Sequence, residues 1–238
     1  MANDYGKDSA ILPKAVFWDM DGTIIDSEPY WHASEVEVAR NHGGQWSEQL
    51  GWQFSGSPII DAAKAMCARG ADAPAERIAQ EIIEGVARRE QERIPWIEGV
   101  VELLESLQEA GVPSLLVTSS PRNVAQAVVE QAPQGVFMAY ICGDDGLAMK
   151  PDPAPYIHAA ALAGINPGDV AACVAIEDSI TGLTSAAASG ATTLAFTGSN
   201  PKDTSAGPQF ASIDSYLGVT AQTLGAYVAS RRSLTFTE

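Results

Sequence analysis

Short apolar runs alternate with helical patterns along most of this chain. The first run, Ala-Val-Phe-Trp at residues 15–18, ends in a turn, as interior strands of parallel sheets do. Further strands are expected at 114–117, 139–142, 170–176 and 191–196, and helices from 99 onward and at 121–130, 153–164 and 180–189. Because strands that alternate with helices pair in parallel and are covered on both faces, the pattern predicts an α/β fold.

Residues 28–97 interrupt this alternation, because no strand is predicted there and apolar residues recur at helical spacing instead. One such stripe consists of Ile78, Ile82, Ile83 and Val86. We therefore expect a small helical unit over residues 28–97, inserted after the first strand of the sheet. The core is then formed by residues 1–27 and 98–238.

The composition fits a folded core in a reducing compartment. Of the 238 residues, 46% are hydrophobic, which is enough to bury a core without disulfides. Cys67, Cys142 and Cys173 are odd in number and widely spaced, which favours reduced thiols and a cytoplasmic location. The first dozen residues lack the basic start and the apolar stretch of an export signal.

Charge and hydropathy exclude two classes of partner. Thirty acidic against fourteen basic side chains give a formal charge of −16, which repels nucleic acid and makes an anionic substrate dependent on local cations. No apolar run approaches the ~20 residues that a membrane span requires. We expect neither nucleic acid nor a membrane as partner, and the sequence does not indicate an oligomeric state.

Two carboxylates, Asp19 and Asp21, directly follow the first predicted strand and precede Gly22. The carboxyl ends of parallel strands are where open α/β sheets bind their ligands. Two close carboxylates repel each other, and a bound divalent cation or a division of acid and base roles removes that conflict. A solvated Asp-x-Asp-Gly turn is the simpler interpretation of this segment taken alone.

Polar side chains also follow other predicted strands, at the same edge of the sheet. Taken singly, they are explained as helix caps or as a surface lysine. Taken together, acids, hydroxyls and a lysine provide the groups that a site for Mg²⁺ and phosphate requires. The set consists of Thr118, Ser119 and Ser120 after the second strand of the sheet, Lys150 in the loop before the helix at 153–164, and Glu177 and Asp178 after the strand at 170–176.

Four segments in this order resemble the four motifs of the haloacid dehalogenase-like phosphohydrolases. They are similar in particular to the subgroup with a helical cap that includes beta-phosphoglucomutase. The segments are Asp19-Met20-Asp21-Gly22-Thr23 with Asp26-Ser27-Glu28, Val117-Thr118-Ser119-Ser120, Lys150-Pro151-Asp152-Pro153, and Glu177-Asp178-Ser179 with Gly182. The match spans nearly the whole chain, and it implies a Rossmann-like parallel sheet core with a cap domain over residues 28–97.

The resemblance implies that Asp19 is a nucleophile. Its carboxylate attacks phosphorus and forms an aspartyl-phosphate, which water then hydrolyses, so that one difficult displacement becomes two easier ones. Asp21 protonates the leaving oxygen and later deprotonates the water, which requires a raised pKa. Thr118 and Lys150 complete the catalytic set, because they donate to phosphoryl oxygens and neutralise their charge. The expected phosphate-binding residues are Gly22, Thr118, Ser119 and Lys150.

The resemblance also implies a bound Mg²⁺ ion. An ionised carboxylate that approaches an anionic phosphate is opposed by Coulomb repulsion, which a divalent cation offsets. Asp19, the backbone carbonyl of Asp21, and Asp178 are the expected ligands, and Glu177 is expected to support the metal site.

Residues of the helical insertion distinguish two possible functions, that of a hydrolase and that of a sugar phosphomutase. Mutases of the subgroup that this chain resembles use a cap histidine soon after the first motif and a cap arginine for a second phosphate. Here Tyr30-Trp31 stands where the histidine is expected, and His32 follows one place later, which is a turn of about 100° on a helix. The segment 56–58 lacks the arginine. We therefore predict hydrolysis of a small phosphorylated metabolite such as a sugar phosphate, with the phosphomutase as the alternative.

Three further alternatives share parts of the pattern. A dehalogenase of the same fold uses one aspartate without a metal, which leaves Asp21 and the pair Glu177-Asp178 as costly unpaired charges. A signalling receiver domain has about half this length and needs no insertion. A phosphate-binding module without catalysis has the same fold, and turnover of a phosphomonoester with Mg²⁺ separates it from an enzyme.

Overall fold

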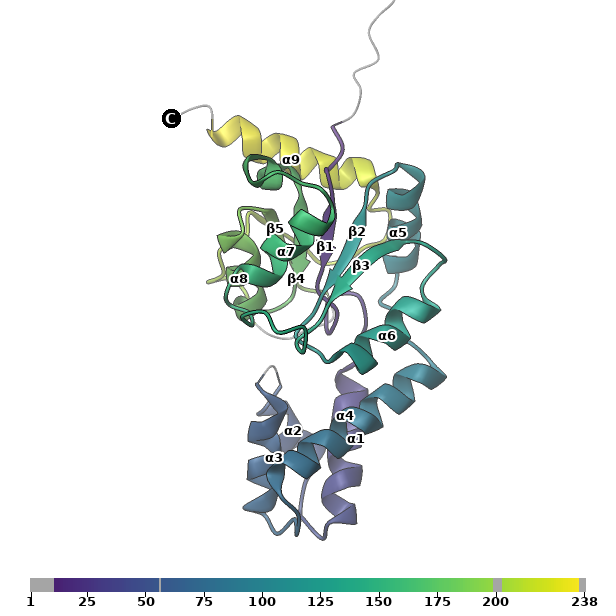
Figure 1. The fold of residues 1–238 in the computed structure, drawn as a ribbon, viewed down its shortest axis with the longest axis vertical. Helices are drawn as coiled ribbons and strands as arrows, with labels where there is room; N and C mark the ends of the chain where they lie inside the picture. Colours follow the sequence, from purple (N-terminus) through teal and green to yellow (C-terminus); the bar gives the residue numbers. More distant parts are fainter. Residues whose placement is uncertain (1–10, 56, 199–202, 236–238) are drawn as a thin grey trace, which may run out of the picture.

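The centre of the molecule is a six-stranded parallel sheet with strand order β3-β2-β1-β4-β5-β6 (Figure 1). The computed structural model describes residues 11–55, 57–198 and 203–235. Phe17 at the middle of β1 is opposite Leu115 of β2 and Ala175 of β4, so β1 is an interior strand. The strands are β1 (Val16–Trp18), β2 (Ser114–Val117), β3 (Phe137–Ile141), β4 (Val174–Glu177), β5 (Thr192–Phe196) and β6 (Ala211–Ile213).

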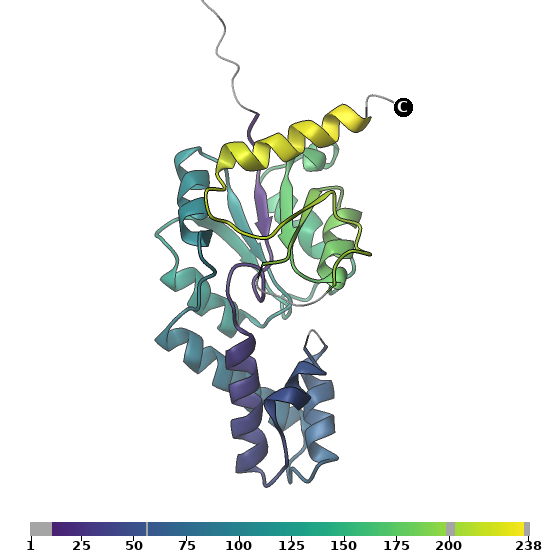
Figure 2. The same cartoon turned by 180° about the vertical axis from the view of Figure 1, so that it is seen from behind.

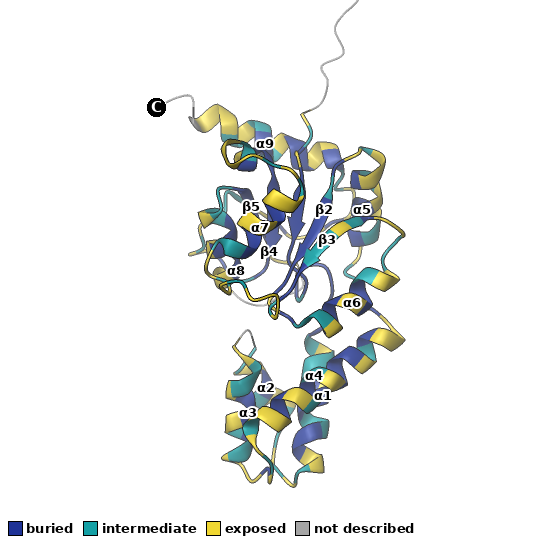
Figure 3. Cartoon of the chain, viewed as in Figure 1, coloured by how far each residue is buried: buried dark blue, intermediate teal, exposed yellow. Residues whose placement is uncertain are grey.

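Helices cover both faces of this sheet, because successive side chains of a strand point to opposite sides. Trp18 packs in one apolar cluster with residues of α5, α6 and α9, whereas Phe17 packs in another with residues of α7. The interior strands β1, β2, β4 and β5 are buried, the edge strands β3 and β6 are only partly buried, and the outer helix faces are exposed (Figure 3). The bounds are α5 (Val100–Glu109), α6 (Arg122–Gln131), α7 (Ala154–Leu162), the 3₁₀ helix η1 (Pro167–Ala172), α8 (Ile180–Ala188) and α9 (Ala221–Thr235).

Four helices form a separate unit beside the carboxyl ends of the strands (Figures 1 and 2). They are α1 (Glu28–Asn41), α2 (Glu48–Trp52), α3 (Ile59–Cys67) and α4 (Ala75–Glu92). The unit has its own apolar cluster, in which Val38, Met66, Ile78 and Ile82 are buried. Within the described part of residues 28–97, the chain contributes no strand to the sheet.

Two crossing segments connect the helical unit to the sheet. Ile25 and Trp96 form an isolated antiparallel bridge, and the Asp26 N–H donates to the Pro95 carbonyl at 2.9 Å. Near the C-terminal end of α4, the Gln131 side chain of α6 donates to the backbone carbonyl of Glu90 at 2.6 Å. The helical unit therefore contacts the rest of the molecule both at the chain crossing and through α4 against α6.

The observed α/β fold confirms the predicted parallel sheet, with three differences in the elements. The expected strand at 170–176 begins only at Val174, because η1 takes up residues 167–172. The edge strand β6 and the C-terminal α9 are not predicted, since β6 is three residues long and α9 buries a narrow stripe at Ala221, Leu224 and Val228.

Cys67, Cys142 and Cys173 are free thiols. A helix with the length and apolarity needed to cross a membrane does not occur in the described residues.

Candidate active site

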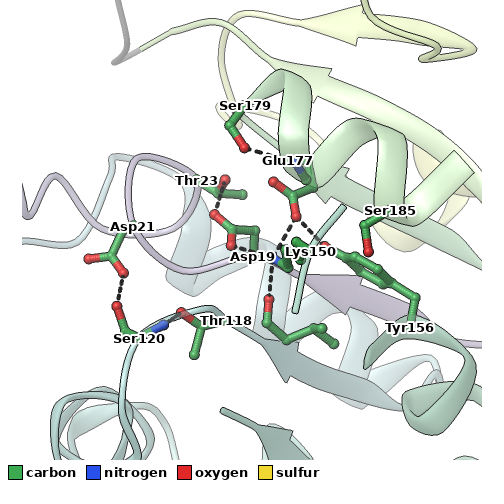
Figure 4. Close-up of polar contacts among 12 residues, drawn as sticks. Asp19, Asp21, Thr23, Thr118, Ser120, Lys150, Tyr156, Glu177, Ser179 and Ser185 are labelled. Atoms are coloured by element: carbon green, nitrogen blue, oxygen red, sulfur yellow. Dashed lines mark hydrogen bonds and ion pairs between the residues drawn. The ribbon is translucent and has the colours of Figure 1, made fainter. Parts of the chain in front are cut away.

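The predicted site residues meet where β1, β2 and β4 end (Figure 4). Trp18, the last residue of β1, is paired with Leu116 and Ile176 on either side. The next N–H along β1, that of Asp19, donates to the Ile176 carbonyl at 3.0 Å. The sheet register thus places Asp19 between the segment after β2 and the acids at the end of β4.

Lys150 joins these segments through three short contacts. Its Nζ lies 2.7 Å from Asp19 Oδ1, 2.6 Å from Glu177 Oε1 and 2.8 Å from the Val117 carbonyl oxygen. The side chain is only 5% exposed. Burial lowers the pKa of Lys150, but the adjacent Asp19 and Glu177 carboxylates outweigh it and raise the pKa above its ordinary value. Lys150 therefore remains a cation inside the site.

Asp19 is fixed by a donor on each carboxylate oxygen. Lys150 contacts Oδ1, and the Thr23 hydroxyl donates to Oδ2 at 2.9 Å. Gly22 makes this possible, because its φ of 80° turns the chain so that Thr23 faces back toward Asp19. The side chain of Asp19 is held in one orientation at the centre of the site.

Glu177 is buried, and its two oxygens have different surroundings. Oε1 accepts hydrogen bonds from Lys150 and from the Tyr156 hydroxyl, whereas Oε2 has no hydrogen-bond partner within the described part of the chain. Burial and the nearby Asp19 raise the pKa of Glu177 above its ordinary value. Gly182 lies directly against this carboxylate, where any side chain would overlap it.

The acids at this edge are suited to hold a divalent cation. Asp19, Glu177 and Asp178 each offer an oxygen within 4.8 Å of the others, and all three are buried. Mg²⁺ prefers carboxylate and carbonyl oxygens. The unpaired Glu177 Oε2 is a buried acceptor that a cation, or a ligand of that cation, would satisfy.

The Asp21 side chain is directed toward Ser120, in the segment that follows β2 (Figure 4). Its Oδ1 accepts from Ser27 at 2.5 Å and from the Trp31 indole N–H at 3.2 Å, and its Oδ2 accepts from Ser120 at 2.6 Å. Loss of hydration raises the pKa of Asp21 above its ordinary value, against the effect of these donors. A raised pKa is what a group that donates a proton and later accepts one requires.

The segment after β2 offers donors to a bound anion. Thr118 Oγ1 accepts from the Ser120 N–H at 2.9 Å, which leaves the hydroxyl proton of Thr118 for another acceptor. Ser119 is exposed, and its carbonyl lies against Gly143, where a Cβ atom would overlap it. The expected phosphate-binding residues Gly22, Thr118, Ser119 and Lys150 thus come from segments that surround Asp19.

Several contacts of the site are not among the sequence predictions. Thr23 and Ser27 lie within the first motif, and Ser120 within the second, so their presence was visible but not their partners. Tyr156 on α7 gave no sequence signal, because only the fold brings its hydroxyl to Glu177. Trp31 was noted for its position in the insertion, and its hydrogen bond to Asp21 emerges only from the packing of α1.

Comparisons with known proteins show which family and which relatives this chain is similar to. A family model described as haloacid dehalogenase-like hydrolase matches residues 13–190. Hexitol phosphatase A from Escherichia coli (strain K12) is 31% identical over 183 residues, which are 76% of this chain and 82% of the relative. Validoxylamine A 7'-phosphate phosphatase from Streptomyces hygroscopicus subsp. limoneus is 28% identical over 178 residues, 74% of this chain and 82% of the relative.

A crystal structure of beta-phosphoglucomutase from Clostridium difficile is similar in fold. It aligns with a TM-score of 0.74 over 93% of this chain and 100% of that chain, at 15% sequence identity. At this identity the likeness concerns the fold alone.

Proposed function

The chain belongs to the haloacid dehalogenase-like hydrolase family, and from this premise we propose that it is a Mg²⁺-dependent phosphatase of a small phosphorylated metabolite such as a sugar phosphate. The four motifs predicted the family, and that prediction is confirmed. The named relatives are phosphatases, so the reaction class is phosphoric monoester hydrolysis. The observation that carries the proposal is the setting of Asp19, which Lys150 and Thr23 hold between segments that offer donors to a phosphate.

In the proposed reaction, an oxygen of Asp19 attacks phosphorus as the bond from phosphorus to the leaving oxygen breaks. Asp21 gives its proton to that leaving oxygen, and the product is an alcohol together with an aspartyl-phosphate. Asp21, now ionised, takes a proton from water, which attacks the aspartyl-phosphate and releases inorganic phosphate. Thr118 and Lys150 donate to the phosphoryl oxygens during both steps.

Asp19, Asp178 and the backbone carbonyl of Asp21 are the groups that would hold Mg²⁺, with Glu177 beside them. When bound, the ion supplies positive charge that offsets the repulsion between the Asp19 carboxylate and the phosphate. Lys150 supplies a second positive charge from the protein itself, because both neighbouring carboxylates keep it protonated.

We assign residues 28–97 as a cap domain on a core of residues 1–27 and 98–238. The crossing at Ile25 and Trp96 is the natural hinge, since only two chain segments pass through it. Closure over the site would exclude water and bring cap side chains to the substrate.

Two features of the cap favour hydrolysis over phosphoryl transfer between sugar positions. Trp31, which stands at the position expected for a mutase histidine, presents an N–H donor to Asp21. His32 instead lies between Glu28 and Glu35, at 3.4 and 3.5 Å from their carboxylate oxygens, and is 3% exposed.

The proposal is tested by phosphate release from p-nitrophenyl phosphate and from a panel of sugar phosphates, hexitol phosphates and phosphoglycolate, with Mg²⁺ and with EDTA. We expect Mg²⁺-dependent turnover that Asp19→Asn abolishes while the circular dichroism spectrum stays unchanged. Turnover that survives Asp19→Asn would refute the nucleophile. A folded protein without turnover on the whole panel would indicate a binding module instead.

A further inference from the structure

Trp31 reaches from the cap to the carboxylate that is assigned as proton donor. Three side chains contact that carboxylate of Asp21, and they come from different places in the fold. Ser27 precedes α1 at the hinge, and Ser120 follows β2 at the edge of the sheet. Among these three, only Trp31 lies within a helix of the cap.

The indole of Trp31 is fixed by packing on two sides. It packs against an apolar cluster that extends from the sheet into α4 and includes Met20, Ile24 and Val86, and also against the cluster within the cap that includes Val38 and Ile82. Rotating the ring would break contacts with one or both clusters, so packing restricts the direction of its N–H.

The chemistry of the indole decides which oxygen of Asp21 can carry a proton. An indole N–H donates and cannot accept, so the oxygen it contacts must act as an acceptor. That oxygen is Oδ1, at 3.2 Å, and Ser27 donates to it as well. Ser120 contacts Oδ2 through a hydroxyl, which can accept as well as donate, so when Asp21 is protonated the proton is directed to Oδ2, the oxygen on the side of Ser120 (Figure 4).

We propose that Trp31 is a positioning residue for proton transfer: its indole N–H fixes the Asp21 carboxyl and keeps Oδ2 as the oxygen that gives the proton to the leaving group. The inference rests on the proposed phosphatase function, and on Asp21 as its acid. Loss of the N–H leaves Oδ1 held by the Ser27 hydroxyl, which can accept as well as donate, so the proton is no longer kept off that oxygen. Protonation of the leaving group then slows, while the attacking carboxylate of Asp19 is unaffected.

Leaving groups that differ in their need for a proton provide the test. The alkoxide of sorbitol 6-phosphate must be protonated as it departs, whereas p-nitrophenolate is stable without a proton. The parameter kcat/KM reports only the steps up to departure of the leaving group, so later hydrolysis of the aspartyl-phosphate does not enter. The measured quantity is the ratio of kcat/KM for the alkyl substrate to kcat/KM for p-nitrophenyl phosphate.

Trp31→Phe removes the N–H and keeps most of the ring. We expect it to lower this ratio by about fivefold to tenfold, since one ordinary hydrogen bond to the protonated carboxyl is lost. Trp46→Phe is the matched control, because the Trp46 indole N–H donates to a carboxylate within the cap, that of Glu35, at 3.0 Å. It should leave the ratio unchanged even if both variants lose similar thermal stability.

An unchanged ratio in Trp31→Phe, whether both rates fall together or neither falls, would overturn the inference, because a purely structural role affects both substrates alike. The variant Asp21→Asn shows whether an unchanged ratio means that Trp31 does not position the acid or that Asp21 is not the acid. If Asp21→Asn lowers the ratio by about a hundredfold and Trp31→Phe does not change it, the acid is correct and Trp31 does not position it. If neither variant changes the ratio, Asp21 is not the acid.

Discussion

The ammonium nitrogen of Lys150 lies 2.7 Å from Asp19 Oδ1, although 131 positions separate the two residues in the chain. The contact neutralises a buried carboxylate that is assigned as the nucleophile, and it orients that carboxylate at the same time. The carboxylate of Glu177 contacts the same ammonium group of Lys150. Stability and activity should therefore depend on the same lysine.

Replacing Lys150 by methionine removes the charge and keeps a similar chain length. Because Asp19 and Glu177 are then left buried without a cation, the free energy of unfolding should fall by about 3–5 kcal/mol, as measured by urea denaturation without metal. Lys14→Met is the control, since its partner Asp169 is 2.8 Å away but both side chains are exposed. That loss should be much smaller, because water screens an exposed ion pair. Equal small losses in the two variants would contradict a structural role for Lys150.

Substituting Gly182 with alanine should damage the metal site. The added Cβ atom would overlap the Glu177 carboxylate, which must then move away from Asp19 and Asp178. We expect Mg²⁺ affinity, measured by isothermal titration calorimetry, to fall by about tenfold or more. Gly168→Ala serves as a control, because no atom lies within 4 Å of its added Cβ. Normal affinity in Gly182→Ala would show that Glu177 does not support the metal.

Asp21→Asn should separate catalysis from metal binding. Only the backbone carbonyl of Asp21 is assigned to the metal, so Mg²⁺ affinity should change little, whereas kcat should fall by about a hundredfold or more. Asp178→Asn is the comparison, since its side chain is among the buried acids of the cluster and should lose metal affinity. Parallel loss of affinity and turnover in Asp21→Asn would contradict the assigned role of its side chain.

Glu90 should make the stability of the protein depend on pH. Its carboxylate is fully buried, and within the described residues neither oxygen has a hydrogen-bond partner. Burial and the charge of Asp21 raise its pKa from 4.5 to about 9. Between these two values the folded protein holds a proton that the unfolded chain has released. The free energy of unfolding therefore falls as pH rises through this range, by up to about 1.4 kcal/mol per pH unit.

Glu90→Gln removes this titration and keeps the shape of the side chain. Urea denaturation should give similar stabilities for the variant and the parent protein near pH 4.5, and a more stable variant at pH 8. Glu92→Gln, two positions later at an exposed site of α4, should follow the parent protein. Identical pH profiles for Glu90→Gln and the parent protein would show that Glu90 does not hold a proton in the folded state.

Local sequence patterns were sufficient to predict strands β1 to β5 and the edge of the sheet that carries the proposed site. The run at residues 15–18 could be assigned to an interior strand because four apolar residues end in a turn, and the structure places β1 between β2 and β4. Since neighbouring parallel strands end at one edge, the segments after β1, β2 and β4 had to meet. The approach of Lys150 to Asp19 follows the same logic, because its loop leads from β3 to α7 at that edge.

Tertiary structure alone decided how those groups are held. The Tyr156 hydroxyl reaches Glu177 because of where α7 packs on the sheet, and the Trp31 N–H reaches Asp21 because of how the cap meets the core. Glu90 belongs to a helical pattern that does not predict a buried carboxylate without hydrogen-bond partners among the described residues. Periodicity in a sequence records which face of an element is apolar. It does not record the distance between side chains on different elements, which depends on packing of the whole chain.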